Sequence, residues 1–395
     1  MEHNPRVIEL NHLPRAIGAM GDFDEPQSQA ASRMAGRVRR ALRLDAVGAD
    51  DAAILMEEAG AMGVVVLHGI PGPGTASPRI LVADHETLKR LSAGVESRGL
   101  KAMGAAIRLT LAAYERTAFV LAFADGGRMD LSDGTRVMGV LNVTPDSFSD
   151  GAAFLSPKKA VEAAARMVDE GADFIDVGGE STRPGAAPVG DDEEARRVVP
   201  VIRAIKRELS IRVSVDTMKA GVARLAIEAG ADLVNDVSAF SDPGMTAVVR
   251  DTHVPVILMH MRGTPRTMQQ DTEYVDLLSS VVGFLRKRLE RAVAAGIPDD
   301  KILVDPGLGF GKSAAGNLRI LRELPTLRSV GRPLVIGASR KAFIGAALDV
   351  PVDERLEGSL AVAACAAWQG AHVIRAHDVA ATKRTTRMID AIGRT

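Results

Sequence analysis

The chain has 395 residues, of which 46% are hydrophobic, so it is longer than one ordinary domain and can bury a large core. Its formal net charge of -1 provides no long-range field to attract nucleic acid or an anionic membrane. Because no run of about 18 apolar residues is present, and the start MEHNPRVIEL lacks the pattern of a signal peptide, we expect a cytoplasmic protein without nucleic-acid or membrane partners.

Residues 1–132 predict a small α/β domain, whose role the sequence does not indicate. Helical periodicity and short apolar runs alternate along it. The expected helices are 49–62, 84–99 and 105–117, and the expected strands are 63–67, 80–83 and 118–124. We interpret the Arg-rich stretch 32–43 as a solvated helix face, and residues 124–135, rich in Gly and Asp, as a linker.

Residues 133–395 repeat one pattern, in which a short strand rich in Val, Ile and Leu precedes a helix that often ends in Gly. The expected strands are 136–143, 172–179, 211–217, 231–238, 254–261, 301–307, 333–339 and 372–378. Such alternation favours parallel strands buried on both faces. We therefore predict a (β/α)8 TIM barrel preceded by the small α/β domain. An open doubly wound sheet is the alternative, but no dinucleotide fingerprint follows the first strand.

Polar side chains occur where the expected strands end, and these ends meet at the mouth of a TIM barrel. Asp216, Asn235 and Asp305 offer carboxylate and amide groups, which complement a heterocycle that presents an amino group beside a ring N–H. Each of these residues alone could instead cap a helix or bond to backbone groups, but such structural roles explain the three together less well. The sequence therefore predicts a heterocycle site at this mouth.

Cationic and small polar groups come from strands one, two and eight, which are neighbours in a closed barrel. Asn142, Arg183, Arg375 and His377 are of this kind, and Arg forks suit phosphate groups. Lys341 precedes an expected helix whose backbone N–H groups can hold another anion, such as a carboxylate.

Two other features of the sequence carry less chemistry. The segment PGLGFGKS resembles a phosphate-binding loop, but Pro306 replaces the first glycine that this loop requires. The single cysteine, Cys365, excludes an internal disulfide, and its apolar surroundings predict that it is buried.

These segments together resemble the dihydropteroate synthase family over residues 135–390. The quoted motifs are GVLNVTPDSFSDG and FIDVGGESTRPGA, followed in the family's order by SVDT, VNDVS, LMHM, DPGLGFGK, GASRKAFIG and RAHD. The resemblance implies a TIM-barrel transferase of folate biosynthesis and a target of sulfonamides. It implies condensation of 7,8-dihydropterin-6-ylmethyl diphosphate with p-aminobenzoate, which gives 7,8-dihydropteroate and pyrophosphate with Mg2+ present.

The resemblance also implies roles for individual residues. Those implied for the pterin are Asp216, Asn235, Met259, Asp305 and Lys341. Those implied for the pyrophosphate are Asn142, which also binds Mg2+, with Thr182, Arg183, Arg375 and His377. Those implied for p-aminobenzoate are Phe148, Ser149, Asp150, Pro184, Phe310, Lys312, Arg340 and Ala342. The implied catalytic residues are Asn142, Arg183, Lys341, Arg375 and His377.

One departure from the family is Ala342, because many members carry Ser there and its hydroxyl contacts the aminobenzoate carboxylate. The affinity for sulfonamides is therefore open. The resemblance further implies a homodimer. Two alternative functions are a pterin-binding methyltransferase barrel, which transfers a methyl group to a corrinoid without a pyrophosphate site, and a non-catalytic pterin-binding paralogue.

Overall fold

The chain divides into two compact units in a computed structural model that describes residues 3–9, 40–69, 76–144, 156–182 and 185–393. The first unit comprises Met1–Arg116 with two later segments, Leu278–Arg286 and Glu323–Gly331. The second unit comprises the remainder, from Thr117 onward.

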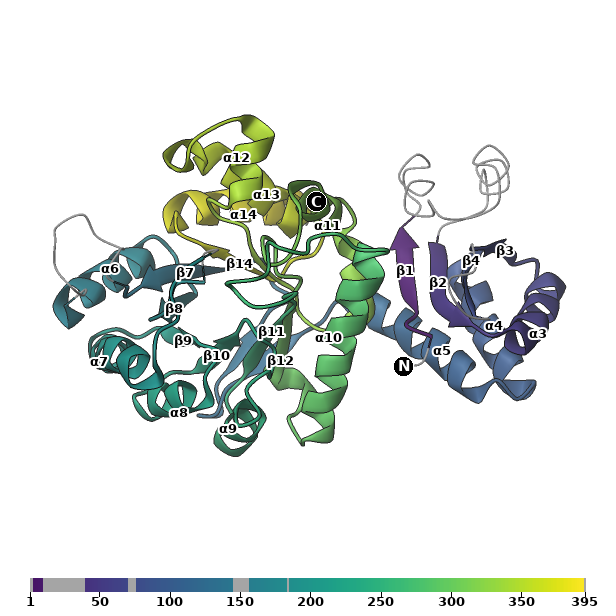
Figure 1. Cartoon of the computed structure of the whole chain (residues 1–395), viewed down its shortest axis with the longest axis horizontal. Helices are drawn as coiled ribbons and strands as arrows, with labels where there is room; N and C mark the ends of the chain where they lie inside the picture. Colours follow the sequence, from purple (N-terminus) through teal and green to yellow (C-terminus); the bar gives the residue numbers. More distant parts are fainter. Residues whose placement is uncertain (1–2, 10–39, 70–75, 145–155, 183–184, 394–395) are drawn as a thin grey trace. The chain divides into compact units, whose positions relative to one another are not determined.

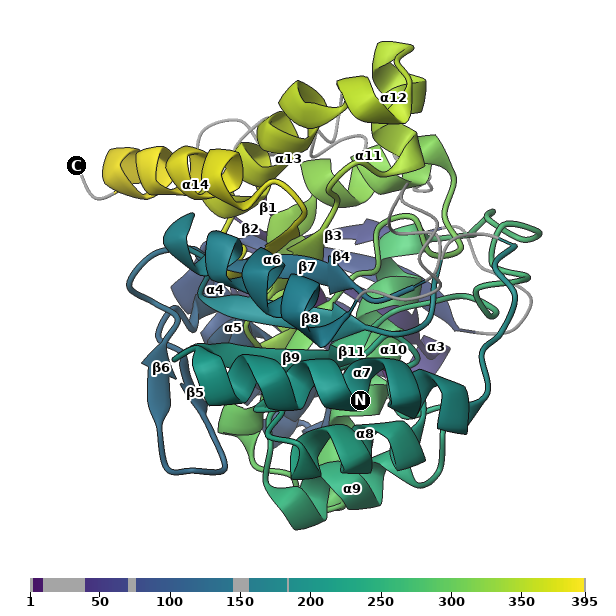
Figure 2. The same ribbon diagram turned by 90° about the vertical axis from the view of Figure 1, so that its left-hand side faces the viewer.

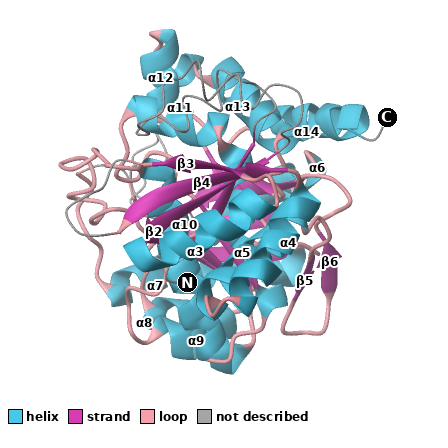
Figure 3. Cartoon of the chain, turned by 90° about the vertical axis from the view of Figure 1, so that its right-hand side faces the viewer, coloured by secondary structure: helices cyan, strands magenta, loops and turns pink. Residues whose placement is uncertain are grey.

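The first unit has a four-stranded antiparallel sheet in the order β1-β2-β4-β3 (Figure 1). Its elements are β1 (Arg6–Glu9), β2 (Arg40–Val47), α3 (Ala49–Ala61), β3 (Val65–His68), β4 (Ser77–Ala83), α4 (His85–Ser97) and α5 (Lys101–Glu115). Figure 3 shows these three helices beside the strands. Leu42 and Leu81 of the sheet share one apolar core with Leu88, Leu91 and Ile107 of the helices.

Strand β2 corrects the interpretation of the Arg-rich stretch as a helix face for its last four residues, 40–43, which lie in this strand. Residues 32–39 lie outside the described part of the chain. Arg43 is buried and its Nε lies 2.9 Å from Oδ1 of Asp45. The same carboxylate oxygen lies 2.9 Å from Nη1 of Arg6 on β1. A shared carboxylate therefore lets two arginines enter the sheet, where repulsion between them would otherwise be costly.

The second unit contains an eight-stranded sheet in the order β12-β11-β10-β9-β8-β7-β14-β13, with every pair parallel. The strands are β7 (Arg136–Asn142), β8 (Phe174–Gly178), β9 (Arg212–Asp216), β10 (Leu233–Asp236), β11 (Val256–Met259), β12 (Ile302–Asp305), β13 (Val335–Gly337) and β14 (Val373–Ala376). A parallel bridge from Val304 to Leu334 joins the two ends of this order. The predicted TIM barrel is confirmed, since the eight strands fall within the eight expected ranges.

Helices cover the outside of the barrel, and Figure 2 shows α6, α7 and α8 on the near side of its strands. The helices are α6 (Pro157–Asp169), α7 (Asp191–Glu208), α8 (Ala220–Glu228), α9 (Met245–Thr252), α10 (Leu277–Ala294), α11 (Ala314–Arg322), α12 (Ala342–Leu348), α13 (Leu356–Trp368) and α14 (Val379–Gly393). Short 3-10 helices are η2 (Asp299–Lys301), η3 (Leu324–Val330) and η4 (Val352–Glu354).

A hairpin of β5 (Val120–Ala122) and β6 (Arg128–Asp130) plugs the end of the barrel at which the strands begin. Phe119 and Phe123 of this hairpin share a core with Phe174 of β8 and Leu233 of β10. The sequence predicts that residues 118–124 complete the small α/β domain and that 124–135 link it to the barrel, but the first segment packs in the barrel core and the second contains β6. The apolar run of β5 is instead used to fill the barrel.

Two expectations about apolar segments have different outcomes. Cys365 is exposed, so the prediction that it is buried is wrong: α13 buries only Ser359, Ala363 and Ala366. Among the helices of the described chain, none combines the length and the apolar character needed to cross a membrane.

Replacing Asp45 tests its role in the first unit. In Asp45→Ala, Arg6, which is 2% exposed, loses this carboxylate partner while it stays buried. We expect the free energy of unfolding to fall by about 3–5 kcal/mol, as for breaking a buried ion pair. The measurement is a urea titration of the intact chain in which unfolding is monitored by hydrogen exchange of the backbone amides of β1 and β2.

The matched control for this measurement is Glu57→Ala, which removes an exposed partner of Arg98. We expect that control to leave the free energy of unfolding nearly unchanged, because the pair is exposed to solvent. Equal effects of the two substitutions would contradict the role given to Asp45.

Candidate functional site

The register of the parallel strands brings the predicted site residues together at the carboxyl end of the barrel. Asn142 on β7 is paired with Gly178 on β8, and Gly178 is paired with Asp216 on β9. Asp216 is paired with Asn235 on β10. These four positions therefore form one row across four neighbouring strands.

Gly178 keeps this row open. A Cβ atom at this position would lie 3.6 Å from Oδ1 of Asn142 and 3.8 Å from Oδ2 of Asp216. The amide oxygen and the carboxylate therefore border the same small space, which any larger side chain at 178 would fill.

Arg375 on β14 connects the strands of the mouth through two carboxylates. Its Nε donates to Oδ2 of Asp176 at 2.6 Å, and its Nη2 donates to Oδ2 of Asp216 at 2.8 Å. Asn235 also donates to Oδ2 of Asp176, at 3.1 Å. Arg375 therefore holds acidic groups of β8 and β9 beside the amide of β10.

Asp176 is a site residue that the sequence analysis missed. It is fully buried in the middle of β8, and its Oδ1 has no hydrogen-bond partner in the described part of the chain. A signal was available, because a carboxylate in the apolar run FIDVG needs a buried counter-charge. That partner, Arg375, lies 199 residues away in the sequence, so local patterns do not indicate it.

The protonation of these groups follows from their burial. Burial raises the pKa of Asp216 to about 7, Arg375 opposes this shift, and the charge of Asp176 adds to it. Burial works to lower the pKa of Arg375, but the carboxylates of Asp176 and Asp216 outweigh it and raise that pKa. The arginine thus stays charged, while Asp216 can change its proton occupancy near neutral pH.

Asp305 at the end of β12 forms the second acidic position. Its pKa is raised by burial, with the ammonium of Lys341 opposing the shift. Burial in turn lowers the pKa of Lys341 to about 8, against the attraction of Asp305. Oδ1 of Asp305 accepts from the backbone N–H of Gly307 at 2.6 Å. Gly307 has φ +66° and its Cβ would lie 2.0 Å from a carbonyl oxygen, so only glycine fits.

Lys341 also connects this acidic position to an apolar wall. Its Nζ donates to the carbonyl of Leu308 at 2.5 Å and lies 4.6 Å from the ring centroid of Phe310. Phe310 belongs to a cluster with Val237 and Met259. The predicted positions Met259, Phe310 and Lys341 are thus brought together, and the apolar cluster suits a flat ring.

Lys312 lies in the same loop but points into the protein. Its Nζ donates to the carbonyls of Gly307 at 2.8 Å and Phe310 at 2.9 Å, and lies 2.9 Å from Nδ1 of His260. Burial lowers the pKa of Lys312 to about 7, and these partners surround its amino group. Lys312 therefore shapes the loop that presents Phe310.

The remaining predicted residues lie around the rim. His377 follows β14, and its Nδ1 lies 3.1 Å from Oγ of Ser339. Arg340 is paired with Asp378 through two N–H groups, at 3.0 and 2.5 Å. Ala342 is exposed at the start of α12. The guanidinium of Arg340 is therefore already engaged within the barrel.

Several predicted residues fall beside or outside this description. Thr182 is half-buried in the segment after β8. The residues that lie outside the described part of the chain are Phe148, Ser149, Asp150, Arg183 and Pro184.

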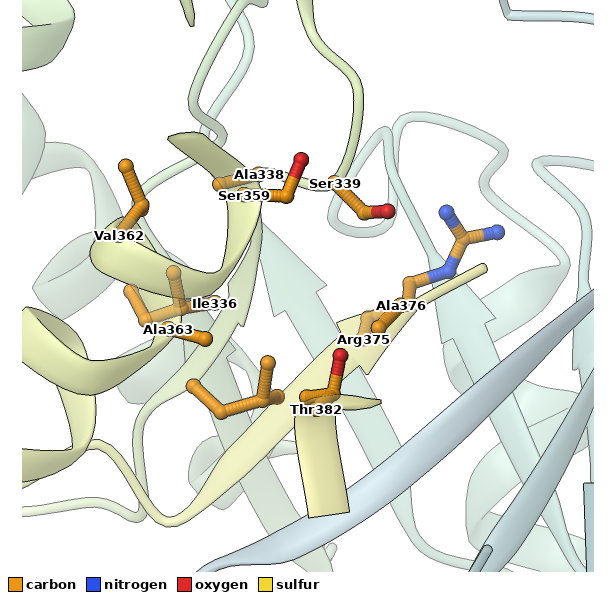
Figure 4. Close-up of a pocket in the computed structure, with 10 residues that line it drawn as sticks. Ile336, Ala338, Ser339, Ser359, Val362, Ala363, Arg375, Ala376 and Thr382 are labelled. Atoms are coloured by element: carbon orange, nitrogen blue, oxygen red, sulfur yellow. The ribbon is translucent and has the colours of Figure 1, made fainter. Parts of the chain in front are cut away.

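A separate cavity lies behind Arg375, between strands β13 and β14 and helices α13 and α14 (Figure 4). Its volume is about 10 Å³, which is room for one water molecule. Ser339, Ser359 and Thr382 contribute hydroxyls to its wall. In Figure 4 the guanidinium of Arg375 points away from the other lining residues. The cavity is therefore part of the barrel wall and too small for a heterocycle.

The chain was compared with known proteins. Residues 138–377 match the family of pterin binding enzymes. The dihydropteroate synthase of Escherichia coli K12 is 47% identical over 269 residues, which are 68% of this chain and 95% of the relative. The corresponding protein of Synechocystis is 46% identical over 267 residues, which are 67% of this chain and 92% of the relative.

Solved structures give the same result. The dihydropteroate synthase of Yersinia pestis in a sulfonamide drug complex has a TM-score of 0.67 and 45% identity, covering 70% of this chain and all of that one. The Xanthomonas albilineans enzyme with 4-aminobenzoic acid has a TM-score of 0.66 and 43% identity, covering 71% of this chain and all of that one. The chain therefore belongs to the pterin binding enzymes and, among them, to the dihydropteroate synthases.

Proposed function

We propose that the barrel mouth joins 7,8-dihydropterin-6-ylmethyl diphosphate to p-aminobenzoate and releases pyrophosphate. The observation that carries this proposal is the row of Asn142, Asp216 and Asn235 beside Arg375, which combines acidic and cationic groups in one site. The relatives are named for this synthase, and the X. albilineans structure holds 4-aminobenzoic acid.

The acidic side of the mouth would bind the pterin. Asp305 and Asp216 would accept hydrogen bonds from its amino and ring N–H groups, and Asn235 would both donate and accept. Buried acceptors favour a ligand that supplies these N–H groups, because an analogue without them leaves the acceptors unpaired. Met259 and Lys341 would border the ring, and their places beside Phe310 support this assignment.

The opposite side would bind the diphosphate, with Arg375 nearest to the pterin site. Thr182, His377 and, from the sequence pattern, Arg183 would hold the remaining phosphate oxygens. Arg375 is already paired with two carboxylates, so it would give its remaining N–H groups to the phosphate.

Mg2+ fits this side through an oxygen donor. The amide oxygen of Asn142 borders the open space at Gly178. The described residues include no group of three or more His, Cys, Asp or Glu that would hold a metal without substrate. Substrate oxygens and water would therefore complete the shell, as is usual for Mg2+. When bound, the ion supplies positive charge to the leaving pyrophosphate.

The chemistry would be a dissociative substitution. The C–O bond between the methylene carbon and the diphosphate breaks first, and its electron pair leaves with pyrophosphate. Arg183, Arg375 and His377 stabilise that charge, while the electron-rich pterin stabilises the cationic methylene. The lone pair of the aminobenzoate nitrogen then forms the C–N bond, and the nitrogen loses a proton to water. No general base is needed, so the rate comes from positioning and charge.

p-Aminobenzoate would bind beside Phe310. Lys312 would contribute by fixing the loop of Phe310, because its ammonium faces three acceptors inside the protein. Arg340 and Ala342 would border the carboxylate end. Phe148, Ser149, Asp150 and Pro184 would complete the pocket; this part rests on the sequence motifs.

We propose further that the chain forms a cytoplasmic homodimer. Large apolar side chains are exposed on neighbouring elements from α12 to α14, and a second copy would cover them. These side chains are Leu348, Val352, Trp368, Met388 and Ile392. Sedimentation of the purified chain tests the proposal, and a monomer at micromolar concentration would contradict it.

We also propose that residues 1–116 form a separate domain of unknown role. Its boundary would lie before β5 instead of after residue 132, because Phe119 and Phe123 belong to the core of the barrel. Activity after deletion of residues 1–116 tests this boundary.

Pyrophosphate release tests the function itself. The purified chain should release pyrophosphate only when the dihydropterin diphosphate, p-aminobenzoate and Mg2+ are all present, and a chelator should stop the release. A methyltransferase or a non-catalytic paralogue would release none. A coupled pyrophosphate assay measures the result, and chromatography should identify dihydropteroate as the second product.

Arg375→Ala tests the cationic side. This change removes a preorganised charge partner of the leaving group, so we expect turnover to fall by about 10² or more. Lys206→Met is a matched control, since it breaks an ion pair with Asp232 at the opposite end of the barrel. Turnover near the wild-type value in Arg375→Ala would refute the assignment.

The pKa of Asp216 predicts how stability depends on pH. Since this pKa is about 7 in the folded chain and 3.8 in the ordinary case, the folded state binds an extra proton between these values. This group therefore makes the wild type progressively less stable as the pH rises from about 4 to 7.

Asp216→Asn removes this titration. We expect the stability of the variant to gain on that of the wild type across the same pH range, in urea titrations without ligand. A constant difference between the two proteins from pH 4 to 7 would show that Asp216 has an ordinary pKa.

A further inference from the structure

Three charged side chains form a cluster at the rim of the barrel, and the family resemblance gives them no role. Nζ of Lys219 lies 2.5 Å from Oε2 of Glu180 and also donates to Oε2 of Glu194. Lys219 directly precedes α8, Glu180 follows β8, and Glu194 lies in the first turn of α7. One ammonium thus joins two consecutive βα units, β8–α7 and β9–α8.

Glu180 also joins the two ends of the loop between β8 and α7. Its Oε1 accepts from the backbone N–H of Val189 at 3.3 Å, while its Oε2 faces Lys219. A single carboxylate therefore fixes the first and last residues of the segment 180–189. Thr182, which we assign to the diphosphate side, lies two residues after Glu180.

The three side chains of the cluster are largely buried, so the attraction between their charges is only weakly screened by solvent. The side chain of Glu194 is 1% exposed, and those of Glu180 and Lys219 are 13% and 20% exposed. Burial raises the pKa of Glu194, and Lys219 opposes that shift. Burial works to lower the pKa of Lys219, but the two carboxylates outweigh it and raise that pKa. Without the ammonium, two acidic groups would repel each other here.

The backbone around the cluster is tightly packed. A Cβ at Gly179 would lie 2.8 Å from Cγ1 of Val198 and 3.0 Å from Cγ of Glu194. The carbonyl of Gly179 accepts from Nη1 of Arg197 at 2.9 Å. The start of the loop is therefore packed against α7.

We propose that Lys219 is a positioning residue that fixes the loop after β8, and with it the diphosphate side of the site, by bridging Glu180 and Glu194. This inference rests on the function proposed above. It assigns the cluster an effect on diphosphate binding. Of the pterin groups, Asp305 and Asn235 lie on other strands, while Asp216 ends the strand β9 that precedes Lys219.

Lys219→Met in the full chain tests the proposal. We expect KM for the dihydropterin diphosphate to rise about tenfold at pH 8, as for the loss of a charge-assisted hydrogen bond. The kcat should stay within about threefold, because the reacting groups are intact. Calorimetric affinity for the dihydropterin alcohol, which lacks the diphosphate, should equal that of the wild type.

The pH profile separates positioning from a general loss of structure. At pH 6 the buried Glu194 of the variant can take up a proton and donate it to Glu180, so the rise in KM should shrink. Other charged groups near the cluster, among the described residues, include Arg197, Asp216, Asp191 and Asp242, and none of these is changed in the variant. Lys219→Met with Glu194→Gln should regain a low KM at pH 8, because the amide can donate to Glu180.

Two further proteins complete the test. Lys206→Met, at the other end of α7, should leave KM unchanged. Should Lys219→Met fail to fold, Glu180→Gln tests the same bridge, with a smaller rise in KM expected. A wild-type KM in both rim variants, or an equal rise in Lys206→Met, overturns the proposal. An inactive wild type instead overturns the proposed function.

Discussion

The pairing of Arg375 with Asp176 and Asp216 is the interaction on which the barrel mouth depends. A guanidinium from the last strand is held between carboxylates of two neighbouring strands, so three separate parts of the chain must be in register for it to form. Burial makes each of these charges costly alone and stabilising together. The two carboxylates keep Arg375 charged, while burial brings the pKa of Asp216 near neutral pH against the effect of the arginine.

The barrel could be predicted from the sequence because its information is local. Each strand is a short apolar run that ends in polar residues or Gly, as in RVMGVLN and LVND, and each is followed by a helix pattern. Since parallel strands put their carboxyl ends at one edge of the sheet, the sequence alone places Asp216, Asn235 and Asp305 in a common site.

Other features depend on contacts between distant residues, and local patterns failed there. The pattern of residues 40–43 predicts a helix, but they form part of a strand that pairs with its neighbours, and Asp45 neutralises Arg43. Asp176 is hidden in an apolar run, and its partner is far along the chain. Lys312 carries a charge that suggests ligand binding, but its acceptors are carbonyls of its own loop and His260. In each case the tertiary structure brings the interacting partner close, so a local sequence pattern does not reveal it.

The hairpin of β5 and β6 bears on how short this enzyme can be made. Its aromatic side chains fill the end of the barrel at which the strands begin, although they precede the first barrel strand in the chain. A catalytic fragment trimmed to residue 136 would leave Phe174 and Leu233 facing solvent at the bottom of the cylinder, and such a fragment should aggregate. A minimal enzyme must therefore begin ahead of Phe119.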